Sequence, residues 1–508
     1  MEIRTVGVVG LGTMGAGIAE VFARGGLEVT AVEVDAGALA RGLKTLDGSL
    51  GRAVAKGRLT EYEREEIMGR VTPAQKYADL ATADLVVEVV PERLEIKRQV
   101  FAELDQACRA DAIIATNTSS LSVTTIAAGS AHPGRVIGMH FFNPAPVMRL
   151  VEVVTTVLAE PSAASAVAEL ARRLGKTPVQ VTDRAGFIAN ALLLPYLNHA
   201  VRLLETGYAS REDIDTAVTA GIGLPMGPLT LLDLIGLDTS LSVLEVLDRE
   251  FGGTRYRPAP LLRRLTDAGH VGRKSGRGFY DYSGQNADPA ADQAPEREAP
   301  GTVTLIDAGD QPATAELASL IAAAGLNVTR NPAHPTDLAI VATGMTGRVL
   351  EPALAAGRAA DAVGIALIYR GTPELAQLAT SPLTTEAALA AARALAAKLG
   401  VRAVHSADRP GLLVHTLLYP HLNDAVAMVA DGYATPEDID SAMTLGCGYR
   451  HGPMRMLDGN DLTRVTGVLA EMHATYGDPA FVPSPLLVDY ARARVRFLPQ
   501  QYSPPPGQ

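Results

Sequence analysis

The chain has 508 residues, of which 47% are hydrophobic and 20% charged, and its formal net charge is −11. This length predicts several domains, and the acidic balance argues against nucleic acid or an anionic membrane surface as the main partner. The two cysteines, Cys108 and Cys447, lie far apart, so we expect no disulfide framework, no zinc site and a reducing, cytoplasmic setting. We expect neither a signal peptide nor a membrane span, since no leader-like segment and no apolar run of about 18 residues is present.

Short apolar runs rich in β-branched residues alternate with helical stretches in the first third of the chain. This alternation predicts parallel strands joined by helices in an α/β domain. From about Gly186 the apolar residues recur at three- and four-residue spacing, which predicts an all-helical domain. The expected strands are Val6–Val9, Val29–Val32, Leu85–Val90, Ile113–Thr116, Val136–Met139 and Val151–Val154.

A glycine-rich loop follows the first expected strand and opens a helix, which is the setting of a dinucleotide-binding fingerprint. Gly10 permits a tight turn, Gly12 lets backbone approach a pyrophosphate, and Gly15 allows close packing of helix on strand. The free N–H groups of the helix N-terminus favour the phosphates. The carboxylate of Glu33, at the end of the second expected strand, favours NAD over NADP. We expect the cofactor to contact Gly10, Leu11, Gly12, Thr13, Met14, Gly15 and Glu33.

Polar segments end two further expected strands, one containing Ser119 and the other beginning at His140. Ligands of doubly wound sheets lie at the carboxyl ends of strands, so both side chains can face the nicotinamide. Oxidation of an alcohol needs a base for the hydroxyl proton, and a neutral imidazole suits that role. Glu152, which follows His140 in the next expected strand, supplies a carboxylate that can orient the ring.

These segments resemble the 3-hydroxyacyl-CoA dehydrogenase family from residue 3 to about residue 282. The resemblance implies that His140 is the general base and Glu152 its partner, while Ser119 and Asn190 hydrogen-bond the reacting oxygen and its polar neighbours. It also implies coenzyme A contacts at Ser49 and Lys56 and cofactor contacts at Glu92, Lys97, Asn117, Ser119, Asn143 and Lys274. The matching motifs are 10–19, 117–120, 140–148, 150–154, 186–190, 225–228 and 272–280.

A local basic segment independently favours a phosphate-bearing substrate. Five cations fall between positions 41 and 58, with Asp47 as the only acid among them. On an acidic chain this segment is a candidate site for the phosphates of coenzyme A. The cations are Arg41, Lys44, Arg52, Lys56 and Arg58.

The second half of the chain repeats part of the first half at a constant offset. Examples are Asp183 with Asp408, Asn198 with Asn423, Gly207-Tyr208 with Gly432-Tyr433 and Gly227-Pro228 with Gly452-Pro453. Such a shared period indicates an internal duplication. We therefore expect a Rossmann-type NAD domain (1–185), a helical domain (186–282), a linker (283–300), a reduced Rossmann-like domain (301–403), a second helical domain (404–498) and a tail (499–508). The reduced domain has expected strands Val303–Ile306, Asp337–Ala342 and Ala362–Ile368.

The repeat lacks the residues that the first copy uses for chemistry. The segment 306–310 carries no glycine fingerprint, no histidine motif follows, and His415 stands at the position of Asn190. We therefore expect a non-catalytic second half that pairs with the first as an internal pseudo-dimer, in a monomer or a homodimer. This layout resembles that of long bacterial 3-hydroxybutyryl-CoA and 3-hydroxyadipyl-CoA dehydrogenases.

The expected activity is NAD-dependent oxidation of an (S)-3-hydroxyacyl-CoA to the 3-oxoacyl-CoA. Two alternatives stay open at this point. The first is an NAD-binding structural or regulatory protein that kept the fold and lost the reaction. The second is a dehydrogenase of a free hydroxy acid on the same scaffold, which would not depend on coenzyme A.

Overall fold

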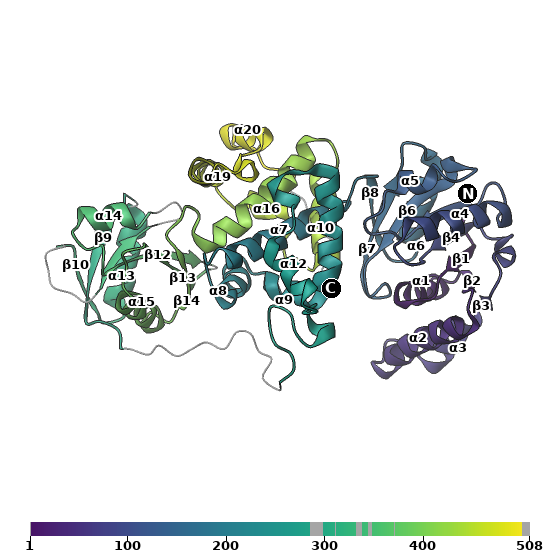
Figure 1. Cartoon of the computed structure of the whole chain (residues 1–508), viewed down its shortest axis with the longest axis horizontal. Helices are drawn as coiled ribbons and strands as arrows, with labels where there is room; N and C mark the ends of the chain where they lie inside the picture. The colour runs from purple at the N-terminus through teal and green to yellow at the C-terminus, as the bar shows by residue number, and fades with distance from the viewer. Residues whose placement is uncertain are drawn as a thin grey trace. The chain divides into compact units, whose positions relative to one another are not determined.

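The computed structural model describes residues 2–284, 298–309, 311–331, 338–343, 348–369 and 371–499 (Figure 1). They form two compact units. The first holds the residues up to Ala191 together with Asp431–Gly452, and the second holds Leu192–Ala430 and Pro453–Pro499. Most of the expected linker, Asp337 of one expected strand and nearly all of the expected tail lie outside the described residues. Among the described helices, none is long and apolar enough to cross a membrane.

An eight-stranded sheet with the order β3-β2-β1-β4-β5-β6-β7-β8 forms the centre of the first unit. Neighbouring strands are parallel, as predicted, except β6 and β7, which are antiparallel. The reason is the short connection, 142–149, because parallel strands need a longer crossover that usually contains a helix. The strands are β1 (Thr5–Val9), β2 (Glu28–Val32), β3 (Val71–Ala74), β4 (Leu85–Glu88), β5 (Ile113–Thr116), β6 (Val136–Phe141), β7 (Leu150–Thr155) and β8 (Thr177–Thr182).

Helices bury both faces of this sheet. One core packs strands against α1 (Thr13–Arg24), α2 (Ala36–Ala55) and α6 (Pro161–Arg173). The opposite core packs them against α4 (Leu94–Ala107) and α5 (Val123–Ala127). Burial on both faces explains the continuous apolar runs of the strands. The remaining elements are α3 (Glu61–Gly69), η1 (Tyr77–Leu80), η2 (Pro133–Arg135) and α17 (Pro436–Cys447).

The second unit contains a six-stranded sheet with the order β10-β9-β11-β12-β13-β14. The helices α13 (Gln311–Ala323), α14 (Leu350–Ala355) and α15 (Glu386–Lys398) lie around it (Figure 1). Its strands β12 and β13 are antiparallel, as are β6 and β7 of the first sheet. The strands are β9 (Thr302–Asp307), β10 (Asn327–Thr329), β11 (Ala339–Ala342), β12 (Ala362–Tyr369), β13 (Pro373–Thr380) and β14 (Arg402–Ala407).

Two sets of helices complete the second unit. The first set is α7 (Ala189–Glu205), whose first turn belongs to the first unit, α8 (Arg211–Thr216), η3 (Ala217–Ile222), α9 (Pro228–Ile235), α10 (Leu237–Phe251), α11 (Gly253–Tyr256), α12 (Pro260–Asp267) and η4 (Arg273–Ser275). The second set is α16 (Leu412–Ala430), α18 (Pro453–Asp458), α19 (Leu462–Tyr476), η5 (Pro479–Phe481) and α20 (Pro485–Ala493).

The duplication extends to individual hydrogen bonds. The Asn198 amide donates to the Arg257 carbonyl at 2.9 Å and accepts from the Ala259 N–H at 2.8 Å. Its counterpart in the repeat, the Asn423 amide, donates to the Val482 carbonyl at 2.9 Å and accepts from the Ser484 N–H at 2.7 Å. Each asparagine therefore holds the same loop of its own repeat. The predicted order of a Rossmann-type domain, a helical domain, a reduced Rossmann-like unit and a second helical domain is confirmed.

Candidate active site

A histidine and a glutamate form a buried pair on neighbouring strands. His140 on β6 lies directly opposite Glu152 on β7, and the His140 Nδ1 is 2.7 Å from the Glu152 Oε2. Both residues are buried, and the rings of Phe142 and Phe187 lie 4.6 and 5.6 Å from the imidazole ring. The antiparallel register explains why these two residues meet across the connection between their strands. An imidazole whose Nδ1–H donates to a carboxylate presents an unprotonated Nε2, which can accept a proton.

The same carboxylate anchors the helix that follows. Oxygen Oε1 of Glu152 accepts hydrogen bonds from the backbone N–H groups of Ile188 and Ala189, each at 3.1 Å. These groups stand at the start of α7, where N–H groups lack partners within the helix. Asn190, the next residue, is half-buried in the first unit. Glu152 therefore positions both the imidazole and the backbone next to Asn190.

The glycine loop has the geometry that the fingerprint predicts. Gly10 has a φ of +93°, and a Cβ there would lie 2.9 Å from the Val89 carbonyl oxygen. A Cβ on Gly15 would lie 1.8 Å from the Gly10 carbonyl oxygen, so only glycine permits this approach of α1 to β1. A Cβ on Gly12 would meet open space, and no side chain caps the helix that begins at Thr13. The N–H groups at this end therefore remain available to a phosphate.

Glu33 lies beside this loop at the end of β2. One of its carboxylate oxygens accepts a hydrogen bond from the Leu11 N–H at 3.1 Å, and the other accepts from the Val34 N–H at 3.1 Å. The carboxylate is therefore fixed next to the loop that would hold a dinucleotide pyrophosphate. Such a position suits a hydrogen bond to a ribose hydroxyl and repels a phosphate.

A buried ion pair supports the segment that carries Ser119. The Lys97 ammonium lies 2.8 and 3.0 Å from the Glu88 oxygens and 3.4 Å from Glu92, and both Lys97 and Glu88 are almost completely buried. Burial raises the pKa of Glu92, but Lys97 and hydrogen bonds from Thr118, Ser119 and Ser120 outweigh it and lower that pKa. The predicted cofactor residue Lys97 therefore has a carboxylate as its neighbour in the core.

Glu88 was not among the residues predicted from the sequence. Oxygen Oε2 of Glu88 also accepts a hydrogen bond from the Thr116 hydroxyl at 2.7 Å, which ties the ends of β4 and β5 together. A glutamate that ends an apolar strand shortly before the lysine of the next helix was a signal that could have found it.

Hydrogen bonds from two residues support the end of β6 and the loop that follows it. The ammonium of Lys176, a second residue that the sequence analysis missed, donates to the carbonyls of Ala145 and Met148 at 2.6 and 2.7 Å. Burial lowers the pKa of Lys176 to about 8, and the charge of Arg24 acts in the same direction. Asn143 in this loop is exposed. The side-chain Oδ1 of Asn117 accepts a hydrogen bond from the Phe141 N–H at 2.8 Å. Asn117 therefore supports the strand that carries His140.

The predicted coenzyme A residues lie on α2 and at its end. Ser49 is half-buried on the helix, and Lys56 is the C-terminal capping residue. Asp47, the acid within the basic segment, pairs with Arg64 at 2.7 Å. Among the described residues, no carboxylate pairs with Lys44, Arg52, Lys56 or Arg58. This part of the first unit therefore presents exposed cations that are free to meet an anion.

Lys274 belongs to the second unit. Its ammonium pairs with Asp238 at 2.6 Å, next to the turn at Gly236. The charge of Lys274 lowers the pKa of Asp238 although burial raises it. Contact of Lys274 with the cofactor stays a prediction.

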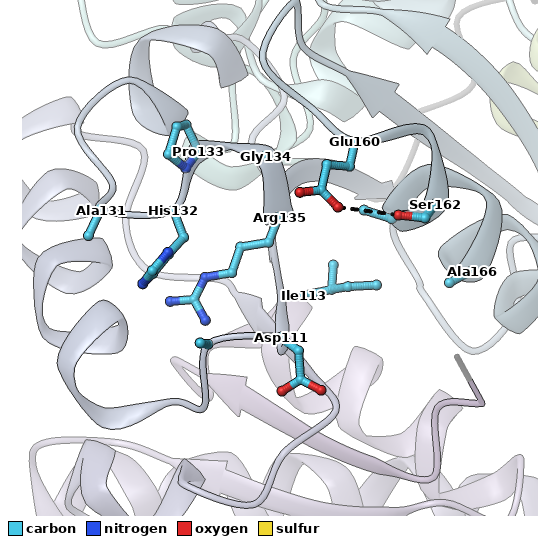
Figure 2. Close-up of a pocket in the computed structure, with 12 residues that line it drawn as sticks. Asp111, Ile113, Ala131, His132, Pro133, Gly134, Arg135, Glu160, Ser162 and Ala166 are labelled. Atoms are coloured by element: carbon cyan, nitrogen blue, oxygen red, sulfur yellow. Dashed lines mark hydrogen bonds between the residues drawn. The ribbon is translucent and has the colours of Figure 1, made fainter.

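A pocket of about 600 Å³ lies in the first unit away from these residues (Figure 2). Ile113, the first residue of β5, and Arg135, just before β6, are among its lining residues, so the pocket lies at the amino ends of the strands. The Arg135 guanidinium is occupied by Asp105 at 2.8 Å and by the Arg109 carbonyl at 2.6 Å. Dinucleotides bind at the carboxyl ends of such sheets, and none of the predicted site residues lines this pocket.

The second sheet has no counterpart of the pair formed by His140 and Glu152. Gln377 is the counterpart of Glu152: it pairs with Val404 on the next strand, as Glu152 pairs with Val179. On its other side Gln377 faces Ala366, where Glu152 faces His140. His415 stands at the position of Asn190, and burial lowers its pKa to about 4. This half therefore holds no base and carboxylate at the equivalent positions.

Comparison with protein-family models identifies both halves. Residues 5–184 match the model of the NAD binding domain of 3-hydroxyacyl-CoA dehydrogenase. Residues 186–282 and residues 411–495 both match the model of the C-terminal domain of the same enzyme. The second match repeats the helical domain, as the internal duplication predicts.

Relatives match either the whole chain or its first half. The chain is 34% identical over 489 residues to 3-hydroxyadipyl-CoA dehydrogenase of Escherichia coli (strain K12). That match covers 96% of this chain and 97% of the relative. The chain is also 48% identical over 282 residues to 3-hydroxybutyryl-CoA dehydrogenase of Mycobacterium tuberculosis (strain H37Rv). This second match covers 55% of the chain and 99% of that relative.

A solved structure matches both units of the chain. The crystal structure of 3-hydroxybutyryl-CoA dehydrogenase from Escherichia coli K12 superposes with a TM-score of 0.82 at 31% identity. The match covers 97% of this chain and 99% of that one.

Proposed function

Because this chain belongs to the 3-hydroxyacyl-CoA dehydrogenase family, we propose that it oxidises (S)-3-hydroxybutyryl-CoA or (S)-3-hydroxyadipyl-CoA to the 3-oxoacyl-CoA with NAD⁺. The observation that carries this proposal is the buried pair of His140 and Glu152, 2.7 Å apart. One full-length relative is named for the 3-hydroxyadipyl group and another for the 3-hydroxybutyryl group, so both thioesters are candidate substrates.

The proton of the reacting hydroxyl passes to His140. Its Nε2 takes the proton as the C3–H bond breaks, and Glu152 stabilises the imidazolium that forms. Bound NAD⁺ would supply the hydride acceptor for C3. Ser119 and Asn190 hydrogen-bond the oxygen and its polar neighbours, which holds C3 in a reactive orientation.

The cofactor is bound by the residues around the glycine loop. The N–H groups at the start of α1 would hold its pyrophosphate, and Glu33 would hold its adenine-side ribose. On the nicotinamide side we assign Glu92 with Asn117 and Asn143, with Lys97 holding Glu92 in place. The open space at Gly12 and the uncapped helix end support the assignment of the pyrophosphate to the start of α1.

Coenzyme A is recognised through the charge of α2. Lys56, Ser49 and Arg52 receive its phosphates, supported by the absence of a carboxylate partner for these cations among the described residues. We also propose a cytoplasmic setting and a monomer with an internal pseudo-dimer, or a homodimer of such chains. The two free cysteines support a reducing compartment.

The decisive experiment follows NADH oxidation with acetoacetyl-CoA beside free acetoacetate. Oxidation with the thioester alone supports the proposal, and oxidation with both favours a free hydroxy-acid dehydrogenase. Binding of NADH without turnover on any acyl-CoA favours a structural or regulatory protein. His140→Ala should bind NADH normally and lose about 10²- to 10⁴-fold in kcat, and near-normal turnover would remove His140 from the mechanism.

A further inference from the structure

Part of the second helical repeat belongs to the unit that carries the catalytic pair. The segment Asp431–Gly452 lies in the first unit, and its helix α17 packs on β7 and β8. The Tyr433 hydroxyl donates to the Thr182 carbonyl at 3.1 Å. The Arg184 guanidinium lies 5.0 Å from the centre of the Tyr433 ring and 3.4 Å from the Asp431 carboxylate. The segment is therefore attached to the end of β8 by directed interactions as well as by packing.

Helix α17 reaches the back of the catalytic pair. A Cβ on Gly446 would lie 2.6 Å from the Leu150 Cδ2 and 3.2 Å from the Phe142 Cε1. Leu150 precedes Glu152 by two residues on β7, and the Phe142 ring is 4.6 Å from the His140 ring. Burial first and then the charge of Glu152 raise the pKa of the Cys447 thiol to about 12. One contact, through Phe142, therefore separates Gly446 from the base.

The first helical repeat makes the equivalent contacts with the second sheet. Gly221 is the counterpart of Gly446 in the first copy, and a Cβ there would lie 2.9 Å from the Cδ2 of Leu375, the counterpart of Leu150. The Arg409 guanidinium lies 5.1 Å from the Tyr208 ring, as Arg184 lies against Tyr433. Elements α8 and η3 pack on β14 and β13 in the second unit. The two helical repeats thus use one packing mode on exchanged sheets, and one of those sheets lacks the base.

We propose that α17 is a positioning element of the active site, and that Gly446 is the positioning residue through which it sets Phe142 and His140. This inference rests on the proposed function of His140. Its consequence is that the non-catalytic half completes the catalytic half within one chain. A chain with a single helical domain would need a second molecule to present the same helix.

The matched variants Gly446→Val and Gly221→Val test this inference in the full chain. Both push a side chain between a helix and a leucine of a sheet, but Gly446 faces the sheet with the base. We expect Gly446→Val to lose at least about tenfold in kcat, with Gly446→Ala intermediate and Gly221→Val within about twofold of wild type. The dissociation constant of NADH should not change in any of them, and the apparent pKa in the pH profile of kcat/KM should move in Gly446→Val alone.

A second readout does not need turnover. The rate at which diethylpyrocarbonate modifies the peptide that contains His140, read by mass spectrometry, should change at least threefold in Gly446→Val and not in Gly221→Val. If wild type fails to oxidise NADH with acetoacetyl-CoA, the proposed function falls while this comparison still tests the positioning.

Two outcomes would overturn the positioning role. One is equal loss of activity in both valine variants in proportion to misfolded protein, and the other is an unchanged kcat and modification rate in folded Gly446→Val. If Gly446→Val does not fold, Tyr433→Phe replaces it with Tyr208→Phe as its control. The proposal then requires a lower kcat in Tyr433→Phe alone.

Discussion

Gln377 occupies in the second sheet the place that Glu152 occupies in the first. The Gln377 Oε1 accepts a hydrogen bond from the Val414 N–H at 2.7 Å, as Glu152 accepts from Ala189, the counterpart of Val414 in the first copy. With Ala366 opposite, Gln377 has no imidazole to orient. The repeat therefore keeps the structural role of the glutamate, which is to hold a helix N-terminus, and lacks its contact with a histidine.

Glu152→Gln should separate these two tasks. The amide oxygen can still accept from Ile188 and Ala189, so thermal stability and NADH binding should stay close to wild type. The amide N–H would point at the His140 Nδ1 and favour the tautomer with a protonated Nε2, which cannot accept a proton. We expect kcat to fall about 10²- to 10⁴-fold in NADH oxidation with acetoacetyl-CoA.

The matched control is Gln377→Glu in the second sheet. It places a buried carboxylate beside Ala366, so stability should fall while kcat stays unchanged. Turnover of Glu152→Gln within threefold of wild type would show that the carboxylate does not set the tautomer.

Lys97→Met should destabilise the first unit strongly. The substitution leaves Glu88 as a buried charge without its cation, which typically costs about 3–5 kcal/mol. Urea unfolding followed by circular dichroism measures the loss. The double variant Glu88→Gln/Lys97→Met removes both charges and should regain part of the stability. Equal stability of the single and double variants would contradict the buried ion pair.

Charge reversal on α2 tests the recognition of coenzyme A. Arg52→Glu/Lys56→Glu should raise KM for acetoacetyl-CoA at least about tenfold with little change in kcat, because the proposal places these cations on a part of the substrate remote from C3. The effect should weaken in high salt, which screens exposed charges. Lys398→Glu/Arg492→Glu changes the net charge equally in the second unit and should leave KM unaltered. Equal KM values in both double variants would move the coenzyme A site away from α2.

The glycine loop and the strand that carries His140 could be predicted because their signals are local. A strand, a turn and a helix start follow one another without interruption, and the fingerprint leaves one physical arrangement for them. In the first sheet the strands that were not predicted, β3 and β8, are its two edges, and each carries a proline, Pro73 or Pro178. Proline lacks the N–H that an interior strand needs, so the pattern reads as a loop, whereas an edge strand tolerates it.

The contact between Gly446 and Phe142 could not be predicted from the pattern. The two residues lie in different halves of the sequence, and periodicity reports which face of a helix is apolar but not which sheet it covers. The repeat revealed that two helical domains exist. It did not reveal that α17 of the second packs on β7 and β8, or that α8 and η3 of the first pack on β14 and β13.

The second helical repeat should make the protein sensitive to mild acid. Burial and the charge of Arg464 lower the pKa of His415 to about 4, and burial and Arg255 lower that of His421 to about 3. A histidine in the unfolded chain titrates near pH 6.5. Between pH 6.5 and about 4 these two histidines therefore bind more protons in the unfolded chain than in the folded one. Their contribution to stability falls as the pH falls and is constant above about 7.

Each histidine should remove on the order of 3 kcal/mol across that window. Urea midpoints measured by circular dichroism at pH 7.5, 6.0 and 5.0 should fall steadily. His415→Asn, which installs the residue found at position 190 of the first copy, should reduce the slope of the midpoint against pH. A slope equal to that of wild type would mean that His415 is already protonated in the folded protein, or that it does not bury its ring.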